Sequence, residues 1–131
     1  MKKDIIIPIV KNIQVVATHE WDKDFLAKTW VVYLINNRED IIESVLVMSR
    51  GNNKNKKTSI LRHGLGDLLP HTGAKVELIS EKVLGFTNEY MVTFFAEGKL
   101  FDRIFTFKPY NVKESNTVFI DLMGQDCVLA V

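Results

Sequence analysis

The chain has 131 residues, of which 47% are hydrophobic and 25% are charged, and its formal net charge is +1. This length and composition predict one globular domain over residues 1–131 and exclude a disordered chain. The near-neutral charge argues against broad binding to phosphate backbones, which requires a strong basic excess. Cys127 is the single cysteine, so the chain cannot form an intramolecular disulfide. We expect a reducing compartment and interpret Cys127 as a small apolar core residue.

An apolar run over residues 5–10 lies near the N-terminus, and Pro8 interrupts it. The run is shorter than the roughly 7–15 apolar residues of a secretory signal. No stretch approaches the ~20 apolar residues that cross a bilayer, so we expect a cytoplasmic protein. We interpret 5–10 as an edge strand, where proline is tolerated. A second strand is predicted over 12–18, and residues 19–28 form a charged connection with room for one helical turn.

The strongest indication of the fold class comes from residues 30–48, WVVYLINNREDIIESVLVM. Residues 30–35 are apolar on both alternating faces, as in a strand that is covered on both sides. Residues 36–40 have the composition of a polar turn, and residues 41–48 return as a second apolar strand. The segment therefore predicts a β-hairpin inside a packed pair of sheets.

Residues 49–57 (SRGNNKNKK) and 62–73 (RHGLGDLLPHTG) have the composition of loops, with a short strand between them. The first loop and its flanks carry a cluster of basic residues. One interpretation is a site for an anion or a nucleic acid. The other, favoured by the near-neutral net charge and the lack of interleaved aromatic residues, is a solvated connection that protects a sheet edge. The basic residues are Arg50, Lys54, Lys56, Lys57 and Arg62.

Residues 74–80, AKVELIS, alternate between apolar and polar side chains and predict a half-exposed strand. We place Val76 and Leu78 on the inward face of this strand. Lys75 and Glu77 are placed on the outward face, toward solvent, and the side of Ile79 is left open.

A second hairpin is predicted over residues 89–107, because apolar runs flank Glu97-Gly98 and glycine allows the positive φ of a tight turn. Its aromatic residues are expected to fill a core between two sheets, the alternative being a ligand groove or a self-association surface. A last short strand over 117–122 brings the total to about seven to nine strands. We therefore predict an all-β antiparallel sandwich of the immunoglobulin-like or fibronectin-like kind.

The sequence shows no convincing constellation of catalytic or metal-binding residues. Ser59, His63 and Asp67 are evenly spaced, but catalytic triads are assembled from distant segments. His19, His63 and His71 lack an H-x-x-x-H pattern or a cysteine partner, so a metal site among them is not predicted. We assign no catalytic or metal-ligating residue and expect no cofactor.

The chain resembles a small family of uncharacterised bacterial proteins in three stretches: WVVYLINN, TSILRHGLGDLLP and FTNEYMVTFFAEGKLFDRIF. Some members of that family carry the label of the α subunit of phenylalanyl-tRNA synthetase. The resemblance spans most of the chain and implies a synthetase-related role as one alternative, but it supplies no catalytic residues. A class II synthetase catalytic domain is a much larger sheet with helices, which a chain of this length does not accommodate.

These observations predict a binding or protein-interaction module that self-associates through an edge strand or an apolar face. The alternative is a tRNA-synthetase-related or RNA-binding accessory protein that uses the basic residues of the 50–62 loop. Neither interpretation involves a membrane.

Overall fold

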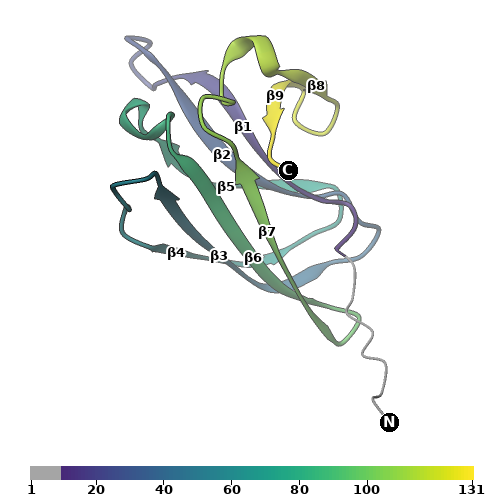
Figure 1. Ribbon diagram of the computed structural model, residues 1–131. Coiled ribbons are helices and arrows are strands. Elements are labelled where there is room, and N and C mark those ends of the chain that lie inside the picture. The colour runs from purple at the N-terminus through teal and green to yellow at the C-terminus, as the bar shows by residue number, and fades with distance from the viewer. Residues whose placement is uncertain (1–9) are drawn as a thin grey trace.

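The computed structural model describes residues 10–131, which form a sandwich of two antiparallel β-sheets (Figure 1). Sheet A has the strand order β5-β2-β1-β9-β8, and sheet B has the order β4-β3-β6-β7. The predicted all-β sandwich is confirmed, whereas the strand predicted over 5–10 lies outside the described residues except for Val10. Within the described part of the chain, no helix is long and apolar enough to span a membrane. The elements are β1 (Ile13–Trp21), β2 (Lys28–Asn36), β3 (Ile42–Asn52), β4 (Leu61–Leu68), β5 (Thr72–Ile79), β6 (Thr87–Ala96), β7 (Lys99–Phe107), β8 (Val118–Ile120), β9 (Gln125–Leu129) and the short 3-10 helices η1 (Glu81–Val83) and η2 (Glu114–Asn116).

The core lies between the two sheets, because alternate residues of each strand point to the facing side. Phe94 of β6 stacks on Phe101 of β7 with ring centroids 5.3 Å apart, and both side chains are buried. Tyr90 meets Phe107 edge-on with centroids 5.9 Å apart. The turn Glu97-Gly98 joins the two strands with φ values of 52° and 71°. The predicted hairpin is therefore confirmed, and its aromatic residues fill the core except for Phe95, which is 44% exposed on the outer face.

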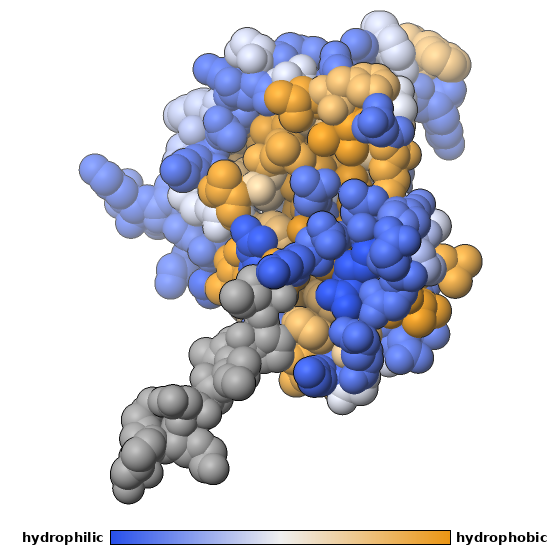
Figure 2. All heavy atoms as spheres, turned by 90° about the vertical axis from the view of Figure 1, so that its right-hand side faces the viewer, coloured by the Kyte–Doolittle hydropathy of each residue, from blue (hydrophilic) through white to orange (hydrophobic). Residues whose placement is uncertain are grey.

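Strand β2 is covered on both faces, as predicted. Its inner side faces sheet B, and on its outer side Ile35 forms a second, small buried cluster with Val16 and Cys127. Cys127 is thus a packed apolar residue, as expected. Half-buried apolar residues around β8 and β9 cover this cluster, and an apolar area lies over this part of the molecule in Figure 2. The covering residues include Ile120, Leu122, Met123 and Leu129.

The connection between β2 and β3 is not the predicted hairpin turn. β2 belongs to sheet A and β3 to sheet B, so the chain crosses from one sheet to the other. The buried side chain of Asn36 holds this corner. Its Nδ2 donates to the carbonyl oxygens of Asp40 and Leu68, each at 3.1 Å, and its Oδ1 accepts from the N–H of Arg38 at 3.0 Å. The alternation of apolar residues is the same for a reversal and for a crossing, so the pattern did not distinguish them.

The passage over 62–73, predicted to be rich in turns, instead contains most of strand β4 at the edge of sheet B, and of the short strand predicted before it only Leu61 is in a strand. Gly66 has a φ of +69°, and the register with β3 shifts beside it. Glycine adopts this conformation without strain, so it permits a bulge within the strand. Strand β3 also extends to Asn52, which forms a bridge with Lys57. The predicted loop over 49–57 is therefore shortened to its tip.

The charged connection predicted over 19–28 is also shorter than expected and contains no helical turn. Strand β1 ends at Trp21, β2 begins at Lys28, and these two residues pair with each other. A turn closes this hairpin, in which Asp22 Oδ1 accepts from the backbone N–H of Leu26 at 3.0 Å. Trp21 is exposed and thus contributes no core contact.

Strand β5 confirms the strand predicted over 74–80, but its faces differ from the prediction. The register with β2 shifts after Val32, which leaves one extra residue in β5. Such a bulge re-aims the side chains that follow it. Glu77 points into the space between the sheets, Ile79 is only 5% exposed and Leu78 is 54% exposed. The inward placement of Leu78 and the outward placement of Glu77 were therefore wrong, and Ile79, whose side was left open, points inward.

The two lateral sides of the sandwich are closed in different ways. On the β7–β9 side, Thr106 and Val131 exchange two backbone hydrogen bonds of 2.8 and 2.9 Å. The predicted strand over 117–122 is present as β8, whereas β9, which leads to Val131, was not predicted. On the β4–β5 side, the closure is made by side chains: His63 Nε2 of β4 lies 2.7 Å from Glu77 Oε1 of β5.

Candidate functional site

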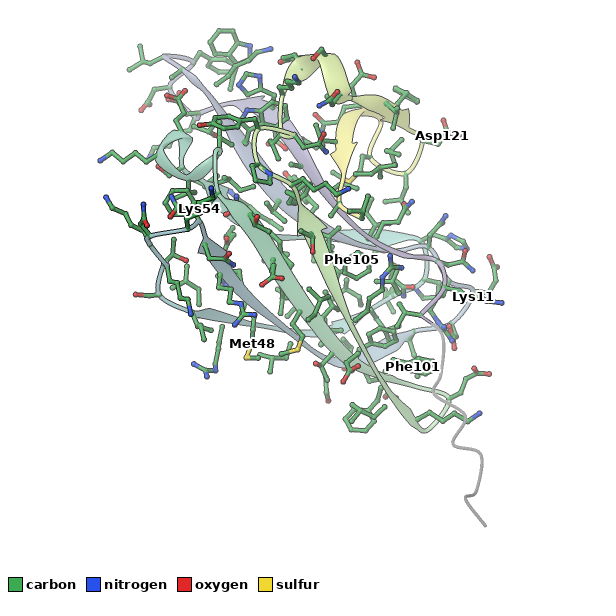
Figure 3. The ribbon with its side chains drawn as sticks, in the orientation of Figure 1. Lys11, Met48, Lys54, Phe101, Phe105 and Asp121 are labelled. Carbon is green, nitrogen blue, oxygen red and sulfur yellow. The ribbon has the colours of Figure 1, made fainter. Side chains whose placement is uncertain are left out.

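The basic residues predicted to bind an anion or a nucleic acid all belong to the β3–β4 hairpin. Arg50 and Arg62 lie on the outer face of sheet B, the face turned away from sheet A. The Nε of Arg50 binds Glu89 Oε1 at 2.9 Å, so one of the five positive charges is locally neutralised. The three lysines lie in the β3–β4 connection, where Figure 3 labels Lys54 at one end of sheet B. These lysines, Lys54, Lys56 and Lys57, are exposed.

The outer face of sheet B carries a group of apolar side chains, here called the outer stripe. Met48, labelled in Figure 3, pairs with Met91 on the neighbouring strand. Met91 pairs in turn with Ile104, so the three side chains share one face. Ile104 is 49% exposed. The outer stripe comprises Leu46, Met48, Ile60, Met91, Phe95, Leu100 and Ile104.

Two charged residues share the face of the outer stripe, at opposite edges of the sheet. Arg62 pairs with Met48 and lies on the edge strand β4. Asp102 pairs with Thr93 and lies on the other edge strand, β7. Neither forms an ion pair with another residue in the range 10–131. The stripe thus has a positive edge and a negative edge.

A second feature, the carboxylate cluster, lies between the sheets around Glu77. Glu77 Oε1 accepts a 2.7 Å hydrogen bond from Ser49 Oγ and lies 2.7 Å from His63 Nε2. Glu77 Oε2 accepts from the hydroxyl of Tyr90 at 2.9 Å. Burial, together with the charge of Glu77, raises the pKa of Tyr90 above its ordinary range, so the hydroxyl stays protonated and donates. The Glu77 side chain is 17% exposed.

A hollow of about 220 Å³ opens beside the carboxylate cluster, on the β4–β5 side. The segment that follows β5 supplies part of its wall, including Ser80 and Val83. The lining is mixed: carboxylate, hydroxyl and amide groups lie next to aliphatic side chains. The lining side chains on which the argument below depends are Leu61, Glu77, Ile79, Val83, Asn88 and Tyr90.

The carboxylate cluster does not have the geometry of a nucleophilic triad. Ser49 donates directly to Glu77, so His63 is not placed as the base that would take the serine proton. The evenly spaced set Ser59, His63 and Asp67 is not assembled either. His63 binds Glu77, whereas Asp67 accepts a backbone N–H from β3 at 3.0 Å.

The three histidines lie apart, each with its own partner. His19 binds Glu114 and stacks on Trp30 with ring centroids 4.3 Å apart. His71 Nε2 lies 2.9 Å from Glu39 Oε2, and the third histidine belongs to the carboxylate cluster. Among residues 10–131, no group of three or more histidine, cysteine, aspartate or glutamate side chains is arranged to hold a metal ion.

Sequence reasoning missed the carboxylate cluster. Its members come from four different strands, so no local spacing connects them. Glu77 lies in a segment in which apolar and polar residues alternate, and this pattern predicted that its side chain faces solvent. The reversal of its direction depends on a bulge, and a bulge without a glycine leaves no mark that a single sequence reveals.

No protein-family model, curated protein or solved structure matches this chain. The resemblance to the bacterial family with synthetase labels therefore stays a prediction. A fold alone does not define a function, so function is inferred from the surfaces and clusters described above.

Proposed function

We propose that this chain is a non-catalytic interaction module whose outer stripe binds the same face of a second copy. The outer stripe is the observation that supports this function. Its apolar side chains gather on one face of a sheet, and no second layer within residues 10–131 covers them. Contiguous exposed apolar surface of this kind marks interaction sites.

The charges at the two edges favour a second copy of this chain as the partner. A half-turn about an axis parallel to the strands places β4 of one copy over β7 of the other. Arg62 of each copy then approaches Asp102 of the other, and both contacts form at once. An interface of this self-complementary kind is typical of two-fold dimers, and its charge pairs fix the orientation.

The size of the face predicts a weak dimer. Four strands about 4.8 Å apart, each with about nine residues rising about 3.3 Å, give roughly 550 Å² per copy. Two such faces bury roughly 1,100 Å², which is at the low end for specific complexes. We therefore expect exchange between monomer and dimer, with a Kd in the micromolar range or weaker.

Sedimentation velocity over a concentration series tests this proposal. Ile104→Lys places a charge in the stripe and is expected to abolish the concentration-dependent increase in sedimentation coefficient. Leu78→Lys is the matched control, because Leu78 is also about half exposed but lies on the outer face of sheet A. A protein that stays monomeric at about millimolar concentration would contradict the proposal.

A charge swap tests the orientation of the two copies. Asp102→Arg is expected to weaken the dimer, because it then faces Arg62 with like charge. The double variant Arg62→Asp with Asp102→Arg restores opposite charges and is expected to recover the dimer. Equal weakening by the single and double variants would show that the edges do not face each other.

RNA binding through the basic residues is the alternative function. Lys54, Lys56, Lys57 and Arg62 are exposed and have no ion-pair partner among the described residues, which supports it. This function predicts retention on immobilised tRNA that falls as salt rises and is lost when the three lysines are replaced by alanine. No retention at low salt would exclude it.

We also propose the immunoglobulin-like or fibronectin-like class for this sandwich, and the strand order supports it. If β1 to β7 are given the letters A, B, C, C′, E, F and G, an E–B–A sheet faces a C′–C–F–G sheet, as in that class. Strands β9 and β8 then extend the first sheet beyond β1. The unpaired, buried Cys127 supports a reducing compartment such as the cytoplasm.

A further inference from the structure

We propose that the hollow beside Glu77 binds a protonated amine or a guanidinium group. This site is separate from the outer stripe, since Glu77 points between the sheets and the stripe lies on the opposite face of sheet B. The proposal depends on the charge of Glu77, on the acceptors around it and on the size of the hollow.

The charge of Glu77 is not balanced by a strong cation. Its side chain is 17% exposed and contacts two neutral hydroxyls, those of Ser49 and Tyr90, together with His63. Within residues 10–131, no lysine or arginine forms an ion pair with it. A partly buried carboxylate is costly unless it is paired, so a cationic ligand gains from entering.

The wall of the hollow offers hydrogen-bond acceptors. A carboxylate has about four lone-pair sites, and the contacts within the chain use three of those on Glu77. The Nδ2 of Asn88 donates to the carbonyl oxygens of Val83 and Phe86, which turns its Oδ1 toward Gly51. An ammonium or guanidinium group has only donors, so it complements this wall.

Gly51 keeps the space beside Asn88 open. A Cβ at this position would lie 2.9 Å from Asn88 Oδ1 and 3.3 Å from Thr58 Cγ2. Arg50 contributes to the lining of the hollow, but its guanidinium binds Glu89 on the outer face of sheet B and forms no ion pair with Glu77. The chain thus leaves the space beside the carboxylate free.

The size of the hollow selects a small group. Its volume of about 220 Å³ is below the roughly 300–1,000 Å³ of pockets that enclose drug-sized ligands. Leu61, Ile79 and Val83 supply aliphatic surface for a short methylene chain. The end of an alkylamine fits this description, and so does the end of a lysine or arginine side chain of a peptide.

Amide chemical-shift mapping with matched probes tests the proposal on the unmodified protein. n-Butylamine is expected to give saturable shifts at Gly51, Ser80 and Asn88. n-Butanol has the same chain without the charge and is expected to bind at least about tenfold more weakly, because it lacks the charge-assisted hydrogen bond. Equal binding of the alcohol and the amine, or no saturable shift with the amine, would overturn the proposal.

Two variants locate the site. Glu77→Gln keeps the shape of the side chain but removes its charge, and it is expected to reduce amine binding at least about tenfold. Glu97→Gln, in the exposed turn between β6 and β7, is the matched control and is expected to leave binding unchanged. Thermal unfolding checks that each variant folds, and the comparison of amine with alcohol does not depend on any variant. Undiminished binding by a folded Glu77→Gln protein would overturn the proposal.

A third probe distinguishes the source of the charged group. N-acetyl-lysine amide and a lysine-containing pentapeptide present the same amine with increasing amounts of backbone. Tighter binding of the peptide than of n-butylamine would support a protein side chain as the natural occupant. Equal binding would support a small free amine, because the backbone then adds no contact.

Discussion

The two sides of the sandwich close the same gap by different chemistry. On the β7–β9 side, Thr106 and Val131 join the sheets through backbone C=O and N–H groups, and only proline lacks the N–H. On the β4–β5 side, the sheets are joined through the carboxylate of Glu77 and its three partners. The first closure tolerates most side-chain changes, whereas the second depends on particular residues.

This difference has a consequence for function. Backbone pairing brings the sheets together closely and leaves its polar groups satisfied. Closure through a carboxylate holds the edges apart by the length of the side chains, and the hollow lies on this side. The side that is chemically specific is therefore also the side with room for a ligand.

Replacing Glu77 with alanine is expected to have the largest effect on stability. The change leaves Ser49, His63 and Tyr90 without their shared acceptor and opens the β4–β5 side. We expect a loss of about 3 kcal/mol in the free energy of unfolding, measured by urea denaturation. Glu89→Ala is the control: it removes the ion-pair partner of Arg50, whose side chain is 54% exposed, and should cost less than about 1 kcal/mol. Similar losses for both variants would mean that the carboxylate cluster does not hold the edges.

Tyr90→Phe is expected to have the next largest effect. The variant keeps the buried ring and removes the hydroxyl that donates to Glu77 Oε2. A hydrogen bond to a charged group contributes about 1.5–3 kcal/mol, and we expect a loss near the lower value because Glu77 keeps two partners. Tyr110→Phe, at an exposed tyrosine, should leave the urea midpoint unchanged. A Tyr90→Phe protein as stable as the unmodified one would show that this bond contributes nothing.

Much of the sandwich followed from the sequence, because its strongest signals are local. The β6–β7 hairpin combines an alternating apolar pattern with a Glu97-Gly98 turn, and both conditions act within one short segment. The prediction of a hairpin turn between β2 and β3 was wrong, because the path of this connection depends on groups distant in the sequence. One of them is the carbonyl oxygen of Leu68, which accepts from Asn36. Strand β4 was not predicted, because its glycines were interpreted as turn residues. Glycines are also tolerated in an edge strand with a bulge.

The candidate sites were harder to predict from the sequence than the fold. The basic residues were identified by composition, but the contact between Arg50 and Glu89 depends on the pairing of β3 with β6. Of the outer stripe, only Phe95 was anticipated, among the aromatic residues for which a self-association surface was the alternative role, since the alternation does not say which face is covered. Glu77 was assigned to the wrong face, because the bulge in β5 reverses the side chains after it.

Val131→Pro tests the backbone closure on the β7–β9 side. Proline removes the N–H that donates to the carbonyl oxygen of Thr106, and a single neutral hydrogen bond contributes about 1 kcal/mol. We expect a loss of about that size, smaller than the loss for Glu77→Ala. Val131→Ala keeps both backbone bonds and should be close to neutral. A large loss for the alanine variant would mean that the side chain, rather than the backbone, closes this side.

Alkaline pH is expected to give the smallest loss in the free energy of unfolding. This effect concerns β9, the strand that precedes Val131. Burial raises the pKa of the Cys127 thiol on β9 to about 11, above its ordinary value of 9.0. The folded state therefore holds the proton more tightly, so this stabilisation is complete below pH 9.0 and is lost as the pH rises toward about 11. Between about pH 8 and about pH 9.5, urea denaturation should show a loss on the order of 0.5–1 kcal/mol. This range stays below the titration of Tyr33, whose pKa is raised to about 12 by burial and by Glu20.

Cys127→Ala removes the titrating thiol and is the variant that checks this effect. The packing lost with the sulfur lowers its stability at every pH, so the comparison concerns the slope of stability against pH rather than the absolute value. We expect a shallower alkaline slope for Cys127→Ala than for the unmodified protein. Identical slopes would show that the thiol is open to solvent and that β9 does not seal the small cluster behind sheet A.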